Sequence, residues 1–221
     1  YPGVRRLAAA GRWAVRATDA ASGRAARLES VTILIRPDVG RGQEAIDTLA
    51  GIVSVEPDDS GAVEMLRRLM AGGELDLAAA DVAELAADAS GDKALAIDVL
   101  RVRERHASEP VEKAAILQGI GAACAAIGMD AEAADAFGDA LACVPSDPAV
   151  LAALFTEMER QGAVTRVVDF VRGAVGGMAD KGAANAIRTQ AAARLASSGE
   201  VRSAIELLQD ALGDREDDPE D

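Results

Sequence analysis

The stretch from residue 117 to residue 145, LQGIGAACAAIGMDAEAADAFGDALACVP, decides the fold of this chain. Its first half places four apolar or small residues at helical spacing: Leu117, Ile120, Gly121 and Cys124. Gly128 then ends this helix. Its second half puts Ala133, Phe137 and Ala140 on one face of a second helix, and Pro145 closes the unit. Two helices joined through a glycine predict an antiparallel helical hairpin.

The same helical phrase recurs elsewhere in the chain at two different offsets. A shift of 88 residues places Glu44-Ala45-x-Asp47 on Glu132-Ala133-x-Asp135 and Pro57 on Pro145. A shift of 71 residues places Asp139-Ala140-Leu141 on Asp210-Ala211-Leu212. A hairpin that recurs in this way cannot bury its apolar face alone, so neighbouring copies are expected to stack into an array.

The phrase resembles the tetratricopeptide repeat (TPR), whose pattern runs W-x2-L-G-x2-Y, then A-x3-F, then P. Leu117 stands at the first aromatic position and Cys124 at the tyrosine, while the remaining spacing matches. The resemblance implies an all-α fold, a right-handed α-solenoid of antiparallel helical hairpins with about 11–13 helices. It is clearest from about residue 110 onward, whereas residues 74–108 give two helical stretches that fit no clean repeat.

We expect three parts: a partial N-terminal repeat or basic helical segment over 1–23, a TPR-like domain over 24–213, and an acidic disordered tail over 214–221. Helices are predicted near 13–21, 24–35 and 163–175, with 31–35 helical rather than a strand. Within the central hairpin, Gly121 should approach Ala133 and Ala140, and Phe137 and Leu141 should fill the gap to the next hairpin. Asp147 and Asp59 are expected to cap the helices that follow them.

Composition and charge narrow the function classes. Half of the residues are hydrophobic, which excludes a disordered chain, and only 2% are aromatic. The net charge is −14, although residues 1–36 carry a net charge of +5, and such an acidic chain does not suit nucleic acid. No apolar stretch is long enough to predict an integral membrane segment. We therefore expect a cytoplasmic protein with two reduced core thiols, Cys124 and Cys143.

The residues that catalysis needs are sparse. His106 is the only histidine, and we interpret it as a surface residue at the end of a helix. Nothing near it in sequence suggests the role that a histidine has in a catalytic triad. One histidine and two separated cysteines give no metal site, and no phosphate-binding glycine motif follows a strand. The sequence thus predicts no enzyme, no cofactor and no metal.

In the TPR family the first helix of each hairpin lines a concave groove that holds peptides or partner helices. By resemblance, the matching groove positions are Gln118, Ala122, Ala125, Thr156, Glu159 and Thr189, flanked by Ala115, Ala149, Ala152 and Ala193. The Lys, Arg and Asn clamp with which some members hold a C-terminal carboxylate is not matched. A small, weakly polar groove fits an apolar helix or an extended segment better. The alternative is that these alanines only pack against neighbouring helices.

Two functional hypotheses remain at this point. The first is a non-catalytic scaffold that binds a protein or peptide partner in the groove. The second is a regulatory or dimerising repeat region of a larger signalling enzyme, for example a kinase, whose catalytic domain lies outside this chain. A homo-oligomer is compatible with both, and Tyr1 suggests a piece of a longer chain. The basic segment around Trp13 indicates either a repeat core or a membrane-surface helix.

Overall fold

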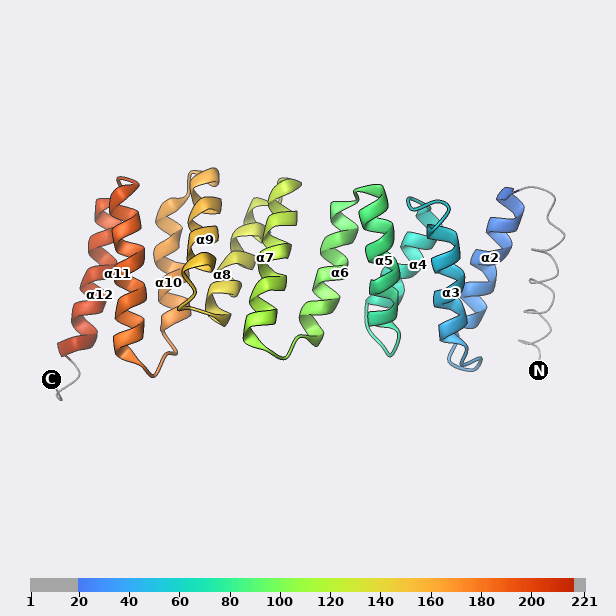
Figure 1. Cartoon of the computed structure of the whole chain (residues 1–221), viewed down its shortest axis with the longest axis horizontal. Coiled ribbons are helices and arrows are strands. Elements are labelled where there is room, and N and C mark those ends of the chain that lie inside the picture. Colours follow the sequence, from blue (N-terminus) through green and yellow to red (C-terminus); the bar gives the residue numbers. More distant parts are fainter. Residues whose placement is uncertain (1–19, 217–221) are drawn as a thin grey trace. The chain divides into compact units, whose positions relative to one another are not determined.

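The structure, a computed structural model, describes the backbone of residues 20–216 (Figure 1). This part contains eleven α-helices and one 3-10 helix, and none of its residues forms a strand. The all-α prediction is therefore confirmed for the described residues. The helices are α2 (Ala20–Leu34), α3 (Gly42–Val53), α4 (Ser60–Met70), α5 (Asp76–Ser90), α6 (Lys93–His106), α7 (Pro110–Ala126), α8 (Asp130–Cys143), α9 (Pro148–Gln161), η1 (Val164–Arg166), α10 (Val167–Val175), α11 (Lys181–Ser197) and α12 (Val201–Glu216).

The chain divides into two compact units, Tyr1–Arg105 and His106–Asp221. In unit 1, α2 pairs with α3 and α4 pairs with α5, and α3 also packs on α5. Helix α6 joins this core through Leu95, Val99 and Val102, which are almost fully buried. Ion pairs from its outer side reach α5 and α4, since Arg103 binds Glu84 at 2.5 Å and Asp98 binds Arg67 at 2.8 Å.

Unit 2 is built from three consecutive hairpins, α7–α8, α9–α10 and α11–α12 (Figure 1). We call the first helices of these hairpins, α7, α9 and α11, the A helices, and the second helices, α8, α10 and α12, the B helices. The second helices pack in sequence, with α10 in contact with both α8 and α12. The hairpin predicted from residues 117–145 is therefore present, and it begins a series of three.

In each hairpin of unit 2, a glycine lies in the turn that follows the first helix. Gly128, Gly162 and Gly199 have φ angles of 77°, 66° and 88°, a left-handed conformation that glycine adopts without steric cost. Asp147 caps α9, because its carboxylate accepts a hydrogen bond from the Ala149 amide at 2.8 Å, and Pro148 follows it. Asp59 caps α4 through the Ala62 amide at 2.9 Å.

The packing around Gly121 adds a contact that the sequence prediction did not include. Gly121 lies against the following helix, as predicted, and the atoms nearest to it there belong to the Phe137 ring. A Cβ atom at Gly121 would lie 2.8 Å from Cε2 of Phe137. Phe137, which was expected between two hairpins, thus also fills space within its own hairpin, and Phe170 of the next hairpin lies directly over Gly138. In both places the glycine leaves room for an aromatic ring.

Several predicted boundaries were wrong. Helix α2 runs through 22–23 without the expected break, because a single helical glycine costs only about 1 kcal/mol while Val31 and Leu34 are buried. The predicted helix over 163–175 is split into η1 and α10. Helix α12 continues through Gly213 for the same reason as α2, so residues 214–216 are helical and not part of a tail.

The remaining predictions concern single residues or lie outside the described part. Residues 31–34 are helical, as predicted. His106 is exposed at the end of α6, also as predicted. Cys124 is buried, but Cys143 is only half-buried because it lies in the last turn of α8. The predictions for Trp13 and for residues 217–221 lie outside the described residues.

Candidate partner-binding face

The A helices of unit 2 are held next to one another by specific contacts. Helix α7 packs against α9. Helix α11 reaches α9 through Ser198, which follows its last residue and whose hydroxyl donates to the Glu159 carboxylate at 3.1 Å. The Arg194 guanidinium also lies over the Phe155 ring, 4.8 Å from its centroid. The A helices of three successive hairpins therefore lie next to one another, and each has one side that faces solvent.

The six residues predicted to bind a partner lie on these outer sides. Ala122, Thr156, Glu159 and Thr189 are exposed, and Gln118 and Ala125 are half-buried. We call this set of solvent-facing stripes on α7, α9 and α11 the A-helix face. The alternative, that these alanines only pack against neighbouring helices, stays open, although Ala122 is exposed in this chain.

The residues predicted as repeat core lie on the opposite sides of the same helices or on α8. Six of them are at most 8% exposed: Leu117, Ile120, Cys124, Ala133, Phe137 and Ala140. Gly121 is also buried. Pro145 is half-buried in the turn before α9. Helix α7 thus has one apolar side in the core and one side of small, weakly polar residues in solvent.

The A-helix face offers few hydrogen-bond donors. The Thr156 hydroxyl donates to the Ala152 carbonyl at 2.9 Å, and the Thr189 hydroxyl donates to the Asn185 carbonyl at 2.8 Å. Both hydroxyls are therefore engaged by their own helices. Ala122 and Ala125 add only methyl groups. A surface of this composition suits an apolar segment better than a carboxylate or a phosphate.

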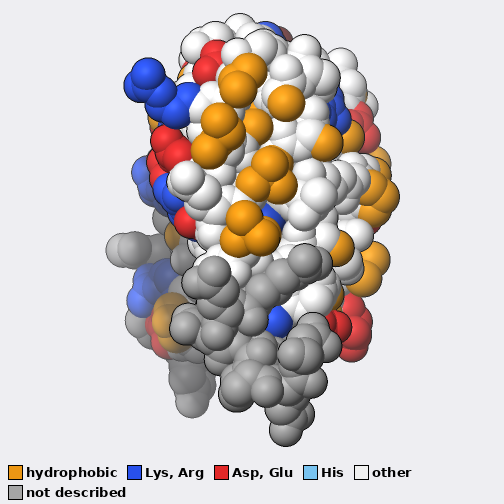
Figure 2. All heavy atoms as spheres, turned by 90° about the vertical axis from the view of Figure 1, so that its left-hand side faces the viewer, with side chains coloured by type: hydrophobic (Ala, Val, Ile, Leu, Met, Phe, Trp, Pro, Cys, Tyr) orange, Lys and Arg blue, Asp and Glu red, His pale blue; other side chains and the backbone are white. Residues whose placement is uncertain are grey.

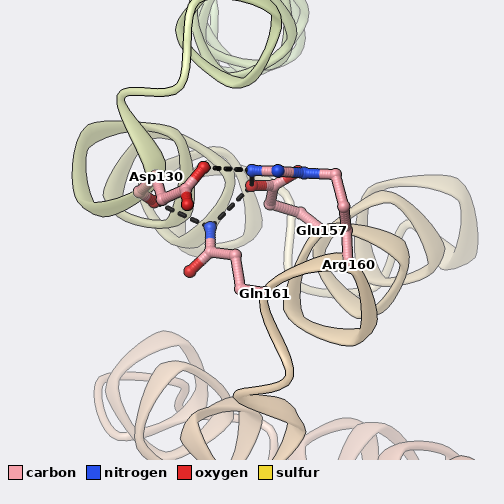
Figure 3. Close-up of polar contacts among 4 residues, drawn as sticks. All are labelled: Asp130, Glu157, Arg160 and Gln161. Carbon is pink, nitrogen blue, oxygen red and sulfur yellow. Dashed lines mark hydrogen bonds and ion pairs between the residues drawn. The ribbon is translucent and has the colours of Figure 1, made fainter.

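A polar cluster fixes the end of α9 to the start of α8 (Figure 3). Arg160 binds Glu157 through two nitrogens, at 2.9 Å and 2.6 Å, and also binds the Asp130 carboxylate. The Gln161 side-chain amide donates to the Asp130 carbonyl at 2.7 Å and to Glu157 at 2.6 Å. Because Asp130 begins α8, these contacts tie α9 to the preceding hairpin, one residue away from Glu159.

The electrostatics of the cluster follow from its geometry. Glu157 is 5% exposed, and a buried carboxylate needs compensating partners. The hydrogen bond from Arg160 lowers the pKa of Glu157 below its ordinary value of 4.5, against the opposing effect of burial, and Gln161 contributes in the same direction. The carboxylates of Glu157 and Asp130 in turn raise the pKa of Arg160. The cluster thus stays ionised and positions α9.

The sequence analysis did not identify this cluster, because acidic residues on helices are most often exposed to solvent. Most are exposed, but Asp59, Asp76 and Glu157 are at most 6% exposed. It also missed Asn185 and Arg188, which are buried on α11 and linked by a 2.8 Å hydrogen bond. The available signal was the helical register: Glu157 falls between Leu154 and Met158, on the side of α9 that is otherwise apolar.

No known family model and no curated protein matches this chain. Among solved structures, it is similar to MamA, with 15% identity and a TM-score of 0.34, over 80% of this chain and 91% of that one. It is also similar to a kinesin-light-chain-type protein of Podosopora anserina with nearly identical TPR-like repeats, with 15% identity and a TM-score of 0.35, over 88% and 96% of the two chains. Because both TM-scores are low, these similarities carry no argument, and the fold is assigned from the hairpins of this chain.

The fold is TPR-like. Its A helices, glycine turns and B helices follow the order that the TPR pattern implies. Within the part of the chain that the structure describes, no group of three His, Cys, Asp or Glu residues could hold a metal ion. None of the described helices is long and apolar enough to cross a membrane.

Proposed function

We propose that this chain is a non-catalytic scaffold whose A-helix face binds an apolar helix or an extended segment of a protein partner. The observation that carries the proposal is the exposure of Ala122, Thr156 and Thr189 on three consecutive A helices. These side chains are small, so a partner backbone can approach closely. The cytoplasmic location inferred from the sequence stays a prediction.

The contacts behind the face support a preformed surface. Arg194 over Phe155, Ser198 on Glu159 and the Glu157–Arg160–Asp130 cluster fix α9 from both sides. A surface that is already ordered loses little conformational entropy when it binds a partner. Binding energy should then come from burial along several hairpins, with a few residues contributing most.

The test uses two double variants that differ only in where the arginines lie. Ala122→Arg with Thr156→Arg places two long cations on the A-helix face. Ala142→Arg with Thr165→Arg is the matched control, because these residues are an exposed alanine on α8 and an exposed threonine on η1. All three proteins are used as bait in an extract of the native host, and captured proteins are identified by mass spectrometry.

The informative partner is one that wild type and the control variant capture and the A-helix variant loses. Its affinity for the three purified proteins is then measured by calorimetry. We expect at least about a hundredfold loss for the A-helix variant, because large charges would be buried against an apolar segment, with unchanged helical circular dichroism. A folded A-helix variant that keeps native affinity would refute the proposal and move attention to the B-helix side.

A further inference from the structure

The outer side of α12 carries a continuous apolar stripe. Four large aliphatic side chains on it are 41–59% exposed: Val201, Ile205, Leu208 and Leu212. Hydrophobic side chains gather in a patch on the end of unit 2 formed by α11 and α12 (Figure 2). The opposite side of α12 is already buried in the hairpin through Ala204, Leu207 and Ala211. Helix α12 is therefore apolar on two sides, and only one of them is covered.

This stripe differs from the other large exposed aliphatic residues of the described chain. Those residues are spread over two helices, α5 and α7, and two turns: Val55, Leu77, Leu85, Val111 and Ile127. Isolated exposed aliphatics are ordinary, but a contiguous apolar stripe indicates an interaction site. In repeat arrays, a helix side that no neighbouring repeat covers is normally polar, whereas the exposed side of α12 is apolar.

The spacing of the stripe points to another helix of the same kind. The four residues follow one another at intervals of four, three and four, which is the a/d pattern of a coiled-coil seam. The pattern also reads the same in both directions. An antiparallel second copy of α12 would therefore set Val201 beside Leu212 and Ile205 beside Leu208 of its partner.

Charge on α12 is arranged so that two copies can approach. With a net charge of −14, copies of this chain repel one another overall. The acids Glu206 and Asp210, however, are turned toward α10, where Arg172 binds Asp210 at 2.7 Å and approaches Glu206 at 3.8 Å. Among residues 201–213 of α12, the polar residues beside the stripe that are exposed rather than half-buried are Arg202 and Gln209. Glu206 and Asp210 are thus paired with Arg172 of their own chain.

The charge pattern disfavours the basic N-terminal segment as the occupant. Residues 1–19 carry four Arg and one Asp and would seek an acidic surface. The exposed flank of the stripe instead carries Arg202, and two nearby acids are already bound by Arg172. We propose that two copies of this chain associate through antiparallel α12 helices about a two-fold axis, with the stripe as the seam.

The first experiment measures the mass of the full 221-residue chain by sedimentation equilibrium from low to high micromolar concentration. Wild type should pass from monomer to dimer and stop there. Ile205→Glu with Leu208→Glu should weaken the dimer at least about tenfold, because each copy would place two carboxylates in an apolar seam. Leu77→Glu with Leu85→Glu on α5 is the matched control and should dimerise like wild type.

The second experiment tests the direction of the helices by disulfide formation in a Cys143→Ser background. Val201→Cys mixed with Leu212→Cys should form a crosslinked pair more efficiently than either variant alone. Efficient crosslinking of Val201→Cys to itself would indicate parallel helices and overturn the antiparallel seam. A wild-type chain that stays monomeric, or a dimer indifferent to Ile205→Glu with Leu208→Glu, would overturn the proposal altogether.

A third pair of substitutions tests whether the basic N-terminal segment, rather than a second α12, covers the stripe. Arg12→Glu with Arg16→Glu should leave the dimer unchanged if α12 pairs with α12. Loss of association in that variant, or growth of wild type beyond dimers, would identify the basic segment of a second copy as the occupant. Either result would overturn the symmetric seam, since a head-to-tail contact does not close on itself.

Discussion

The two units bring helices close together by different means. In unit 2, the closest approaches set a glycine under an aromatic ring, Gly121 under Phe137 and Gly138 under Phe170. In unit 1, the corresponding approaches set a glycine under the end of a leucine. Gly61 faces Leu28, at 2.7 Å from a Cβ position to the Leu28 Cδ1 atom, and Gly42 faces Leu75.

The two kinds of contact restrict the residue at the glycine position to different degrees. A phenylalanine ring is rigid and cannot turn away from a new side chain without moving its whole plane. The end of a leucine can change rotamer at modest cost. Unit 2 therefore demands glycine at fixed positions, whereas unit 1 tolerates more. This difference also explains why the repeat pattern is legible after residue 110 and weak before it.

The largest effect that sharpens this comparison should come from Gly121→Leu in unit 2. The leucine would overlap the Phe137 ring, which is 8% exposed, and we expect a loss of about 1–3 kcal/mol in the free energy of unfolding. The control is Gly51→Leu on α3 in unit 1, where a Cβ atom meets nothing within 4 Å. Urea denaturation measures both, and equal stability of the two variants would contradict the glycine–ring contact.

The helices could be predicted from the sequence because the residues that begin and end them act locally. Gly128, Gly162 and Gly199 end helices, and Asp59 and Asp147 begin them, all through backbone geometry that depends on neighbouring residues. The breaks expected at 22–23 and after Gly213 failed because tertiary packing outweighs the small cost of one helical glycine.

The two repeat offsets could be found in the sequence but not explained by it. The shift of 71 residues places α7–α8 on α11–α12, four helices apart, which is two whole hairpins. The shift of 88 residues places α3–α4 on α8–α9, five helices apart. The additional helix is α6, which packs on α5 and α4 without a second helix of its own in unit 1. An odd helix changes the offset and hides the register from sequence comparison.

The predicted binding positions were accessible to sequence reasoning, but the polar cluster behind them was not. Helical periodicity placed Ala122, Thr156 and Thr189 on one side of their helices, and the structure exposes all three. The contact between Arg160 and Asp130 joins residues 30 positions apart. Whether a surface acid is solvated or paired depends on how adjacent hairpins stack, which the local pattern does not contain.

A smaller effect should separate the ion pairs of the two units. Arg160→Ala removes the bidentate partner of the buried Glu157, and we expect a loss in the free energy of unfolding at neutral pH that exceeds the loss for a matched variant in unit 1. Arg67→Ala in unit 1 is the control, because its partner Asp98 is 41% exposed, and it should cost less than about 1 kcal/mol. Equal losses in urea denaturation would contradict a special role for the cluster.

The same pair predicts a pH dependence with a definite sign. Since the pKa of Glu157 is lowered in the folded protein, its stabilising contribution is complete above the ordinary value of 4.5. It is lost as the pH falls below 4.5 toward the lowered pKa, because the unfolded chain then binds the extra proton. Arg160→Ala should therefore flatten the stability profile on the acid side, and an unchanged profile would argue against the pairing.

The smallest effect tests whether the two units respond alike where neither has a close contact. Gly51 on α3 and Gly173 on α10 are exposed helical glycines with nothing within 4 Å of a Cβ position. Alanine at either position should stabilise its helix by up to about 1 kcal/mol, because alanine loses less backbone entropy. Amide hydrogen exchange should show slower opening of α3 in one variant and of α10 in the other.

Gly162→Ala is the control with opposite sign. The φ of 66° at this position strains any side chain, so the substitution should accelerate exchange at the end of α9. If Gly173→Ala also accelerated exchange, the outer side of α10 would be more crowded than the structure indicates, and the contrast between open and ring-covered glycines in unit 2 would fail.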